Sequence, residues 1–177
     1  GKQGHAIASE ISRLGAKTIL ITGPTALEAP KGVTVVQVET ACEMYEACKA
    51  SLPTDIAVCA AAVADWRPET TNDKKIKKSG DPPVISMIKN PDILECLGDS
   101  SLNRPALLIG FAAETGDVVD EGQRKLVKKN CDWLLANDVS PGTSVFGGEF
   151  NTIHLITKAG IEPWPKMTKK EVAKRLV

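Results

Sequence analysis

The chain has 177 residues, in which 22 lysines and arginines balance 22 aspartates and glutamates, so its formal net charge is zero. That length suits one ordinary domain with a sizeable core. The balance gives no general attraction to nucleic acid or to a membrane surface, so any anion site must be local. No apolar run approaches the ~20 residues of a membrane span, and the opening residues do not resemble a signal peptide. We therefore expect a cytoplasmic protein with neither nucleic acid nor membrane as a partner.

The five cysteines form no Cys-x-x-Cys pair, and the two histidines, His5 and His154, lie far apart in the sequence. This usage is typical of reduced cytosolic thiols rather than of a disulfide framework or a zinc site. A histidine-based metal cluster is not expected. Cys59 lies in an apolar segment without a nearby histidine, so we do not expect it to act as a nucleophile.

The first third of the chain shows one helix pattern and two strand patterns. Apolar residues at helical spacing predict a helix over about residues 2–14, which Gly15 ends. Short apolar runs predict strands at residues 17–22 and 33–38. Since α/β domains usually open with a strand and a glycine loop, we expect the first strand and most of that loop to be missing from this chain.

The next elements indicate a parallel sheet. Thr40 and Glu43 have the spacing of a capping box, which predicts a helix to about Leu52. The run at residues 56–61 is apolar without alternation, as is typical of a strand covered on both faces. The chain thus begins as a doubly wound α/β fold.

The second half continues in the same style. Strands are predicted at residues 84–88, 106–111 and 133–136, helices from Asn90 and over 118–129, a hairpin over Asn151–Trp164, and a last helix from a Thr168–Glu171 capping box. Asn90 would be the N-cap and Pro91 the first helical residue of its helix. We predict a single α/β domain over residues 1–177. It is a three-layer, Rossmann-like, mostly parallel sheet with helices on both faces and a late β-hairpin.

Open α/β sheets bind ligands beyond the carboxyl ends of their strands. The residues at those ends are Gly23, Ala61–Asp65, Phe111–Glu114 and Asn137–Asp138. The alanine run allows a flat ligand to approach the backbone, although alanines in a strand usually serve packing alone. Asp65 either contacts a ribose or base, or caps a turn. Glu114 and Asp138 are candidates for holding a divalent cation together with phosphates, but nothing in the sequence requires this.

Two groups of lysines and one helix N-terminus are candidate anion-binding sites, and each also has a purely structural interpretation. Lys74–Lys78 contains four lysines, which either close over a polyanion or form a solvated loop. Lys125 and Lys129 share a helix face, where they either meet the helix dipole or bind phosphate. Gly1 and Gly4 open either an anion-binding helix terminus or an ordinary amphipathic helix.

Five segments occur together in a recognisable order and spacing: Ala61–Arg67, Lys75–Lys78, Lys89–Ile93, Gly110–Thr115 and Ala136–Val139. Together they resemble the bacterial, CTP-dependent phosphopantothenoylcysteine synthetase domain. In that family it is part of a bifunctional phosphopantothenoylcysteine decarboxylase/phosphopantothenate–cysteine ligase of coenzyme A biosynthesis. The resemblance covers nearly the whole chain.

The resemblance implies a two-step ligation. The carboxylate of 4'-phosphopantothenate attacks the α-phosphate of CTP, which gives an acyl-cytidylate and pyrophosphate; the amine of L-cysteine then displaces CMP. It also implies Mg²⁺ with the CTP, a homodimer, and a fused decarboxylase domain in the full-length protein, where FMN would bind. FMN is not expected in this chain. The late hairpin would be part of the dimer contact.

The resemblance also assigns site residues. Lys75 would be catalytic, in a flap over the phosphates, and no metal ligand is assigned. The substrate and nucleotide site would comprise Ala60, Ala61, Asp65, Lys75, Pro91, Asp92, Ile93, Leu94, Phe111, Lys125 and Lys129. Ala61 and Asp65 would contact the nucleoside, and residues 91–94 would offer helix-terminal N–H groups.

Two other functions stay open. One is a Rossmann-type dinucleotide-binding oxidoreductase, although the chain holds no G-x-G-x-x-G segment. The other is a non-catalytic nucleotide-binding fragment. In the family, the segment before the position of Gly1 holds an asparagine that acts on the acyl-cytidylate, so its absence leaves open whether this chain is active by itself.

Overall fold

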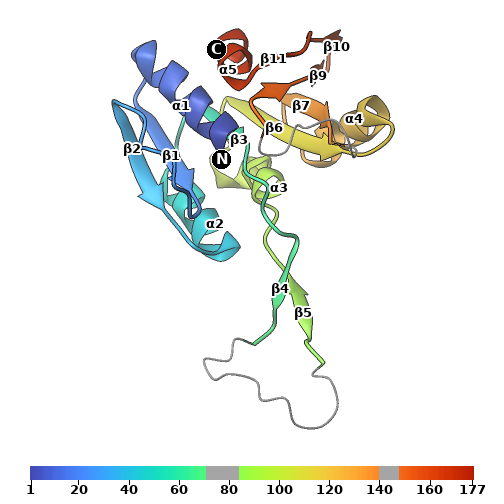
Figure 1. The fold of residues 1–177 in the computed structure, drawn as a ribbon. Helices are drawn as coiled ribbons and strands as arrows, with labels where there is room; N and C mark the ends of the chain where they lie inside the picture. The colour runs from blue at the N-terminus through green and yellow to red at the C-terminus, as the bar shows by residue number, and fades with distance from the viewer. Residues whose placement is uncertain (71–83, 140–147) are drawn as a thin grey trace.

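The computed structural model describes residues 1–70, 84–139 and 148–177. Its main sheet has five strands in the order β10-β9-β7-β6-β3 (Figure 1). Their bounds are β3 Ile56–Cys59, β6 Leu107–Glu114, β7 Trp133–Asp138, β9 Ile153–Thr157 and β10 Gly160–Pro163. β3, β6 and β7 run parallel, and the β9–β10 hairpin joins β7 antiparallel. The predicted α/β class, parallel core and late hairpin are therefore confirmed.

Helices cover both faces of this sheet. They are α1 Lys2–Arg13, α2 Ala41–Ala50, α3 Ile93–Leu97, α4 Val118–Lys128 and α5 Lys169–Leu176. Leu108 and Leu134 are buried with residues of α3 and α4 on one face. Ile109 and Leu135, one position further along each strand, are buried with residues of α1 and α5 on the other. Since successive side chains of a strand point to opposite faces, both β6 and β7 need apolar residues throughout.

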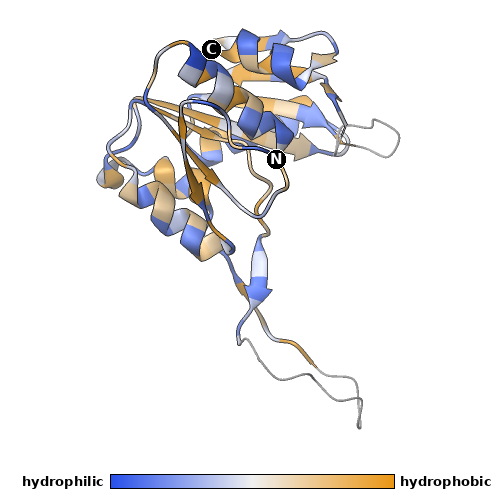
Figure 2. Cartoon of the chain, turned by 60° about the vertical axis from the view of Figure 1, so that its left-hand side comes forward, coloured by the Kyte–Doolittle hydropathy of each residue, from blue (hydrophilic) through white to orange (hydrophobic). Residues whose placement is uncertain are grey.

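Hydropathy follows this layering. Figure 2 shows hydrophobic colour concentrated on the strands, whereas the helices carry both hydrophobic and hydrophilic positions. Both predicted capping boxes form: Thr40 with Glu43 opens α2, and Thr168 with Glu171 opens α5. In the described ranges no helix is both long and apolar enough to cross a membrane.

β1 Thr18–Thr22 and β2 Val33–Gln37 form a separate parallel pair. Within residues 1–70, 84–139 and 148–177, no hydrogen-bonded ladder joins this pair to the five-stranded sheet. A second small pair, β8 Phe150–Asn151 with β11 Met167–Thr168, connects the late hairpin to α5. Sequence patterns missed this pair because two-residue strands carry no periodicity.

A projecting arm replaces the predicted strand at residues 84–88. β5 Met87–Lys89 pairs antiparallel with β4 Trp66–Pro68, and the two extend away from the body (Figure 1). No sequence pattern predicted β4, since Pro68 cannot donate to a ladder and indicates a break. Trp66, Ile85 and Met87 are exposed on this arm. The lysine segment Lys74–Lys78 lies outside the described residues.

The start of α3 also differs from the prediction. Asp92, and not Asn90, is the N-cap, and its carboxylate accepts the N–H of Glu95 at 3.1 Å. The Asn90 side chain instead donates to the carbonyl of Ala64 at 2.7 Å and accepts from Arg67 at 3.1 Å. Both residues are good caps in isolation. Asp92 becomes the cap because the Asn90 side chain is held by residues at the base of the arm, more than twenty residues earlier in the chain.

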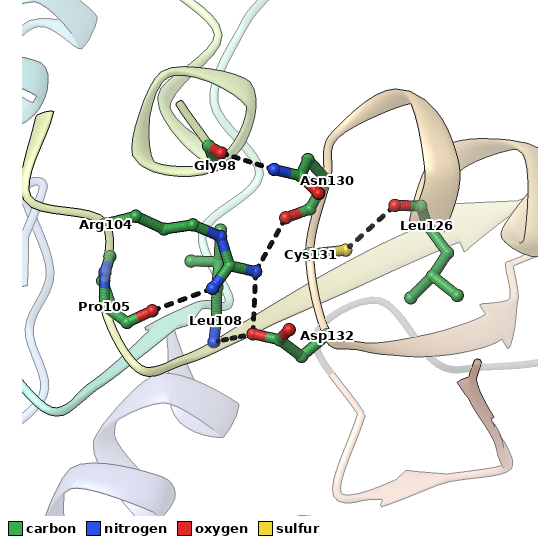
Figure 3. A network of polar contacts seen from close by, with 8 residues as sticks. All are labelled: Gly98, Arg104, Pro105, Leu108, Leu126, Asn130, Cys131 and Asp132. Atoms are coloured by element: carbon green, nitrogen blue, oxygen red, sulfur yellow. Dashed lines mark hydrogen bonds and ion pairs between the residues drawn. The ribbon is translucent and has the colours of Figure 1, made fainter. Parts of the chain in front are cut away.

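A polar network fixes the amino ends of β6 and β7 (Figure 3). The Asp132 carboxylate accepts the backbone N–H of Leu108 at 2.7 Å and pairs with Arg104 at 2.8 Å. Arg104 also donates to the carbonyl of Asn130, whose side-chain amide donates to the carbonyl of Gly98. The network joins the segments before both strands to the end of α3, so it sets where the opposite ends of the strands lie.

Candidate active site

A cavity of about 890 Å³ lies where the strands end. It is lined by Thr22 at the end of β1 and Gly23 after it, Val38 after β2, Ala60–Ala64 after β3, Phe111 and Ala113 on β6, and Asn137 on β7. Gly23, Ala61, Phe111 and Asn137, which the sequence places at the carboxyl ends of four strands, therefore line one cavity. Asp65 in the loop after β3, and Glu114 and Asp138 as the last residues of β6 and β7, do not line the cavity.

The alanine run forms one wall. β3 ends at Cys59, so Ala60 and Ala61, which were predicted to be the end of this strand, belong to a loop that continues to Ala64. Ala61, Ala62 and Ala64 are exposed towards the cavity instead of being packed in the core. The interpretation of these residues as core packing is wrong for these three. Their small side chains leave the backbone open to close approach by a ligand.

The beginnings of α1 and α5 also line the cavity. Gly1, Lys2 and Gln3 line the cavity, as does Lys169 at the start of α5. The Gln3 side chain donates to the carbonyl of Lys169 at 3.0 Å, and Lys2 pairs with Glu149. Burial and the neighbouring Lys2 cation lower the pKa of Lys169, and Glu149 opposes them. Lys2 and Lys169 thus bring two cations to this part of the lining, where Glu149 partly balances them and the first N–H groups of α1 also lie.

Two buried asparagines belong to the cavity lining as well. Asn137 is only 7% exposed and Asn151 only 5%, and both line the cavity. Sequence reasoning placed Asn137 at a strand end without counting it among the site residues, and it missed Asn151. The available signal was a polar residue closing an apolar strand, which Asn137 shows. Asn151 becomes visible only when β8 pairs with β11 and brings it beside α5.

Lys125 and Lys129 lie in or next to the last turn of α4, as predicted, but they do not line the cavity. Lys125 pairs with Glu114 at 2.6 Å. Lys129, with 13% of its side chain exposed, pairs with Asp92 and with Glu95, the latter at 2.7 Å. Burial lowers the pKa of Lys129, but the hydrogen bonds to these two carboxylates raise it further, so the net shift is upward. Carboxylates thus already partner both ammonium groups.

The remaining predicted site residues lie in the loop after β3, at the start of α3, and in the segment outside the described residues. Asp65 is exposed, and its carbonyl accepts the N–H of Asn90 at 2.8 Å. Pro91 has no N–H, so the prediction that it would offer one is wrong. Ile93 and Leu94 occupy the first helical positions, whose N–H groups have no acceptor inside a helix. Lys75 lies outside the described residues.

Metal and thiol chemistry find little support in the described ranges. These residues contain no group of three His, Cys, Asp or Glu side chains that could hold a metal ion. Burial raises the pKa of the Cys59 thiol to about 12, with Cys48 and Cys131 adding to the rise. Cys59 is thus a poor nucleophile at neutral pH, as predicted.

Comparison with known proteins agrees with this arrangement. The family described as "DNA/pantothenate metabolism flavoprotein C-terminal domain" matches residues 1–177. The coenzyme A biosynthesis bifunctional protein CoaBC of Borreliella burgdorferi is 39% identical over 180 residues, covering 100% of this chain and 45% of that protein. Its namesake from Haemophilus influenzae is 42% identical over 178 residues, covering 100% and 44%. The chain thus spans less than half the length of these relatives.

A solved structure gives the same result for the fold. The crystal structure of the C-terminal domain of coenzyme A biosynthesis bifunctional protein CoaBC has a TM-score of 0.81 and 39% sequence identity. The match covers 99% of this chain and 79% of that one. The arrangement of strands around the cavity is therefore one that a solved relative shares.

Proposed function

We propose, since the chain belongs to the DNA/pantothenate metabolism flavoprotein C-terminal domain family, that it is a phosphopantothenate–cysteine ligase of coenzyme A biosynthesis. The match over the whole chain carries this proposal, and relatives named for coenzyme A biosynthesis support it. The cavity at the strand ends is the site at which the reaction would occur.

The reaction would proceed in two steps. A carboxylate oxygen of 4'-phosphopantothenate attacks the α-phosphorus of CTP, and pyrophosphate leaves. The amine of L-cysteine then attacks the acyl carbon, loses a proton, and releases CMP. Both steps depend on positioning and on neutralising phosphate charge, so a site without a nucleophilic side chain suffices. Mg²⁺ would enter with the CTP and supply charge neutralisation for the leaving pyrophosphate.

The proposal gives the cavity walls separate tasks. Ala60 and Ala61 let the nucleoside approach the backbone after β3, and Phe111 offers it an aromatic surface. Asp65 continues the same loop and would contact the ribose. Lys125 and Lys129 would exchange carboxylate partners for phosphates, because both already lie near the start of α3 or the end of β6.

Pyrophosphate release tests this function. The natural full-length protein is incubated with 4'-phosphopantothenate, L-cysteine and Mg²⁺, and CTP is compared with ATP. We expect pyrophosphate, CMP and the cysteine adduct with CTP, and much slower turnover with ATP. Thermal stabilisation by CTP without any turnover would instead support a non-catalytic nucleotide-binding module.

The role of Lys75 stays a prediction from the resemblance. Lys75→Gln should lower the rate of pyrophosphate release by at least about a hundredfold, because a charge clamp on the phosphates is lost. Lys158→Gln, in the turn between β9 and β10, is the matched control and should keep full activity. Near-normal turnover of Lys75→Gln would instead support the interpretation of the lysine segment as an ordinary solvated loop.

We further propose a homodimer, joined in natural proteins of this family to a decarboxylase domain that holds FMN. Two surfaces offer contacts: the apolar residues Trp66, Ile85 and Met87 on the arm, and the exposed strand β10, an edge of the five-stranded sheet. Sedimentation velocity on Met87→Ser and Ile161→Lys variants tells which surface is used. A monomeric wild-type protein would contradict the dimer.

A further inference from the structure

Asn90 directly follows β5, at the point where the arm joins the body beside α3 (Figure 1). It lines the cavity, and so does Ala64, the last residue of the alanine loop Ala60–Ala64. The backbone N–H of Asn90 donates to the carbonyl of Asp65 at 2.8 Å, and its side-chain amide donates to the carbonyl of Ala64 at 2.7 Å. One residue thus holds two successive carbonyls, at the end of the alanine loop and just after it.

Two partners fix the orientation of the Asn90 amide. The guanidinium of Arg67, which can only donate, binds the amide oxygen at 3.1 Å, and the carbonyl of Ala64, which can only accept, faces the amide nitrogen. Arg67 is itself tied across the arm, because it also donates to the carbonyl of Lys89 at 2.6 Å. Arg67 does not line the cavity. Any effect of Arg67 on a ligand there must therefore pass through its neighbours.

The alanine loop needs such an anchor. β3 holds its start, where Cys59 pairs with Gly110 on β6. Within residues 1–70, 84–139 and 148–177, no backbone–backbone hydrogen bond joins Ala61–Ala64 to another segment. The alanine and valine side chains of the loop have no polar atoms with which to form one. A loop held at its start alone would have to be ordered by the ligand, at a cost in conformational entropy.

We infer that Asn90 is a positioning residue of the nucleotide site. Its amide holds Ala64, and with it the main-chain shape of the alanine loop, while Arg67 holds the amide. This inference rests on the proposed function, in which the nucleoside approaches the backbone of this loop. A preformed loop stabilises the nucleotide equally in the ground state and in the transition state. Loss of Asn90 therefore raises the Michaelis constant for CTP and leaves kcat nearly unchanged.

Asn90→Asp is the sharpest single change, because it keeps the size and the acceptor for Arg67 but turns an oxygen towards the carbonyl of Ala64. Asn90→Ala is the second variant, since it removes the amide without adding a charge that repels CTP. Asn130→Asp is the matched control: the side chain of Asn130 also donates to a backbone carbonyl, that of Gly98, at 2.7 Å, and Asn130 does not line the cavity. Melting temperatures show that each variant is folded.

Steady-state kinetics of the natural full-length protein test the positioning role. Asn90→Asp and Asn90→Ala should raise the Michaelis constant for CTP at least about fivefold, and should keep kcat and the constant for L-cysteine within about twofold. Asn130→Asp should lower the melting temperature and leave the constant for CTP unchanged. An unchanged constant for CTP in both Asn90 variants, or a fall in kcat alone, would overturn the positioning role.

A double-mutant cycle tests whether Arg67 acts through Asn90. Arg67→Ala should raise the constant for CTP by less than Asn90→Ala does, since the bond to Ala64 can still form. The double variant should be no worse than Asn90→Ala alone, because the guanidinium then has no amide to orient. Fully additive effects on the constant for CTP would contradict this chain of contacts.

Binding separates this inference from the proposed function, because the thermal shift that CTP gives needs no turnover. If CTP stabilises wild type and Asn130→Asp but not Asn90→Ala, while no pyrophosphate forms, the positioning role stands and the ligase proposal fails. If pyrophosphate forms and the Asn90 variants bind CTP as wild type does, the ligase proposal stands and the positioning role fails. A wild type that gives no shift with CTP overturns the positioning role.

Discussion

At the scale of single residues, the buried thiol of Cys59 makes the stability of the fold depend on pH. The residue as a whole is only partly buried, but its sulfur is enclosed near Cys48 and Cys131. Burial raises the pKa of this thiol from 9.0 to about 12. Below pH 9 the Cys59 thiol keeps its proton in both the folded and the unfolded chain, so the contribution of this thiol to the free energy of unfolding is fully present. Above it the unfolded chain releases the proton first, so the free energy of unfolding falls as the pH rises towards 12.

We therefore predict a loss of stability at alkaline pH that depends on Cys59. Urea unfolding measured at about pH 8 and about pH 10.5 should give a lower midpoint at the higher pH. Cys59→Ala should be less stable than wild type at the lower pH, since a buried side chain is shortened, but its midpoint should fall less between the two. Equal falls in both proteins would show that other groups cause the alkaline loss.

At the scale of elements, the sheet is aligned by contacts between segments far apart in the chain. Asp132 stands just before β7 yet accepts the N–H of Leu108 on β6. With Arg104 it forms a half-buried ion pair, with 19% and 28% of the side chains exposed. Breaking one partner of such a pair leaves a backbone donor and a guanidinium without their acceptor.

Asp132→Ala should lower the free energy of unfolding by about 2–3 kcal/mol, and Asp132→Asn by less, because the amide oxygen can still accept from Leu108. The exposed pair Glu121–Arg124 gives the control. Glu121→Ala should cost at most about 0.5 kcal/mol. Urea unfolding measures all three, and similar losses for Asp132→Ala and Glu121→Ala would contradict the role of the network.

Elements also show what sequence patterns can and cannot predict. β6, β7 and the capped helices α2 and α5 follow from local signals: apolar runs without alternation, and Thr-x-x-Glu spacings. The arm does not, since each of its strands has three residues and one contains Pro68. The start of α3 was predicted at the wrong cap because Asn90 serves a partner 26 residues away.

The candidate site divides in the same way. The cavity at the strand ends was predictable, because it depends on strand direction alone. The partners of Lys129 were not, since they lie 34 and 37 residues earlier, on and just before another helix. Nor was Asn151, which enters the site through the pairing of two very short strands. Non-local contacts of this kind leave no periodic trace in the sequence.

At the scale of the whole molecule, the cavity lies between the β1–β2 pair and the five-stranded sheet, and its loop after β3 consists of small side chains. Ala61 is exposed towards the cavity, whereas Ala112 on β6 is buried at 4% exposure. Ala61→Leu should leave the melting temperature nearly unchanged and abolish the thermal shift given by CTP, because the added atoms occupy ligand space. Ala112→Leu should destabilise the fold, since overpacking a core typically costs about 1–3 kcal/mol.

The thermal shift that CTP gives in the Ala61→Leu variant shows whether the alanine loop contacts the nucleotide. A normal CTP shift in Ala61→Leu would remove the alanine loop from the binding site. Loss of the shift in a protein that melts normally would place the ligand against this loop. The measurement needs only a melting curve with and without nucleotide.

The alanine wall also affects how this protein would look in a mutational survey. Alanine scanning finds binding residues by deleting atoms, and Ala60, Ala61, Ala62 and Ala64 have no side-chain atoms beyond Cβ to delete. Such a scan would score the wall as silent and would direct attention to the lysines around it. A scan that adds atoms, such as leucine or tryptophan scanning, is the kind that detects a surface recognised through its main chain.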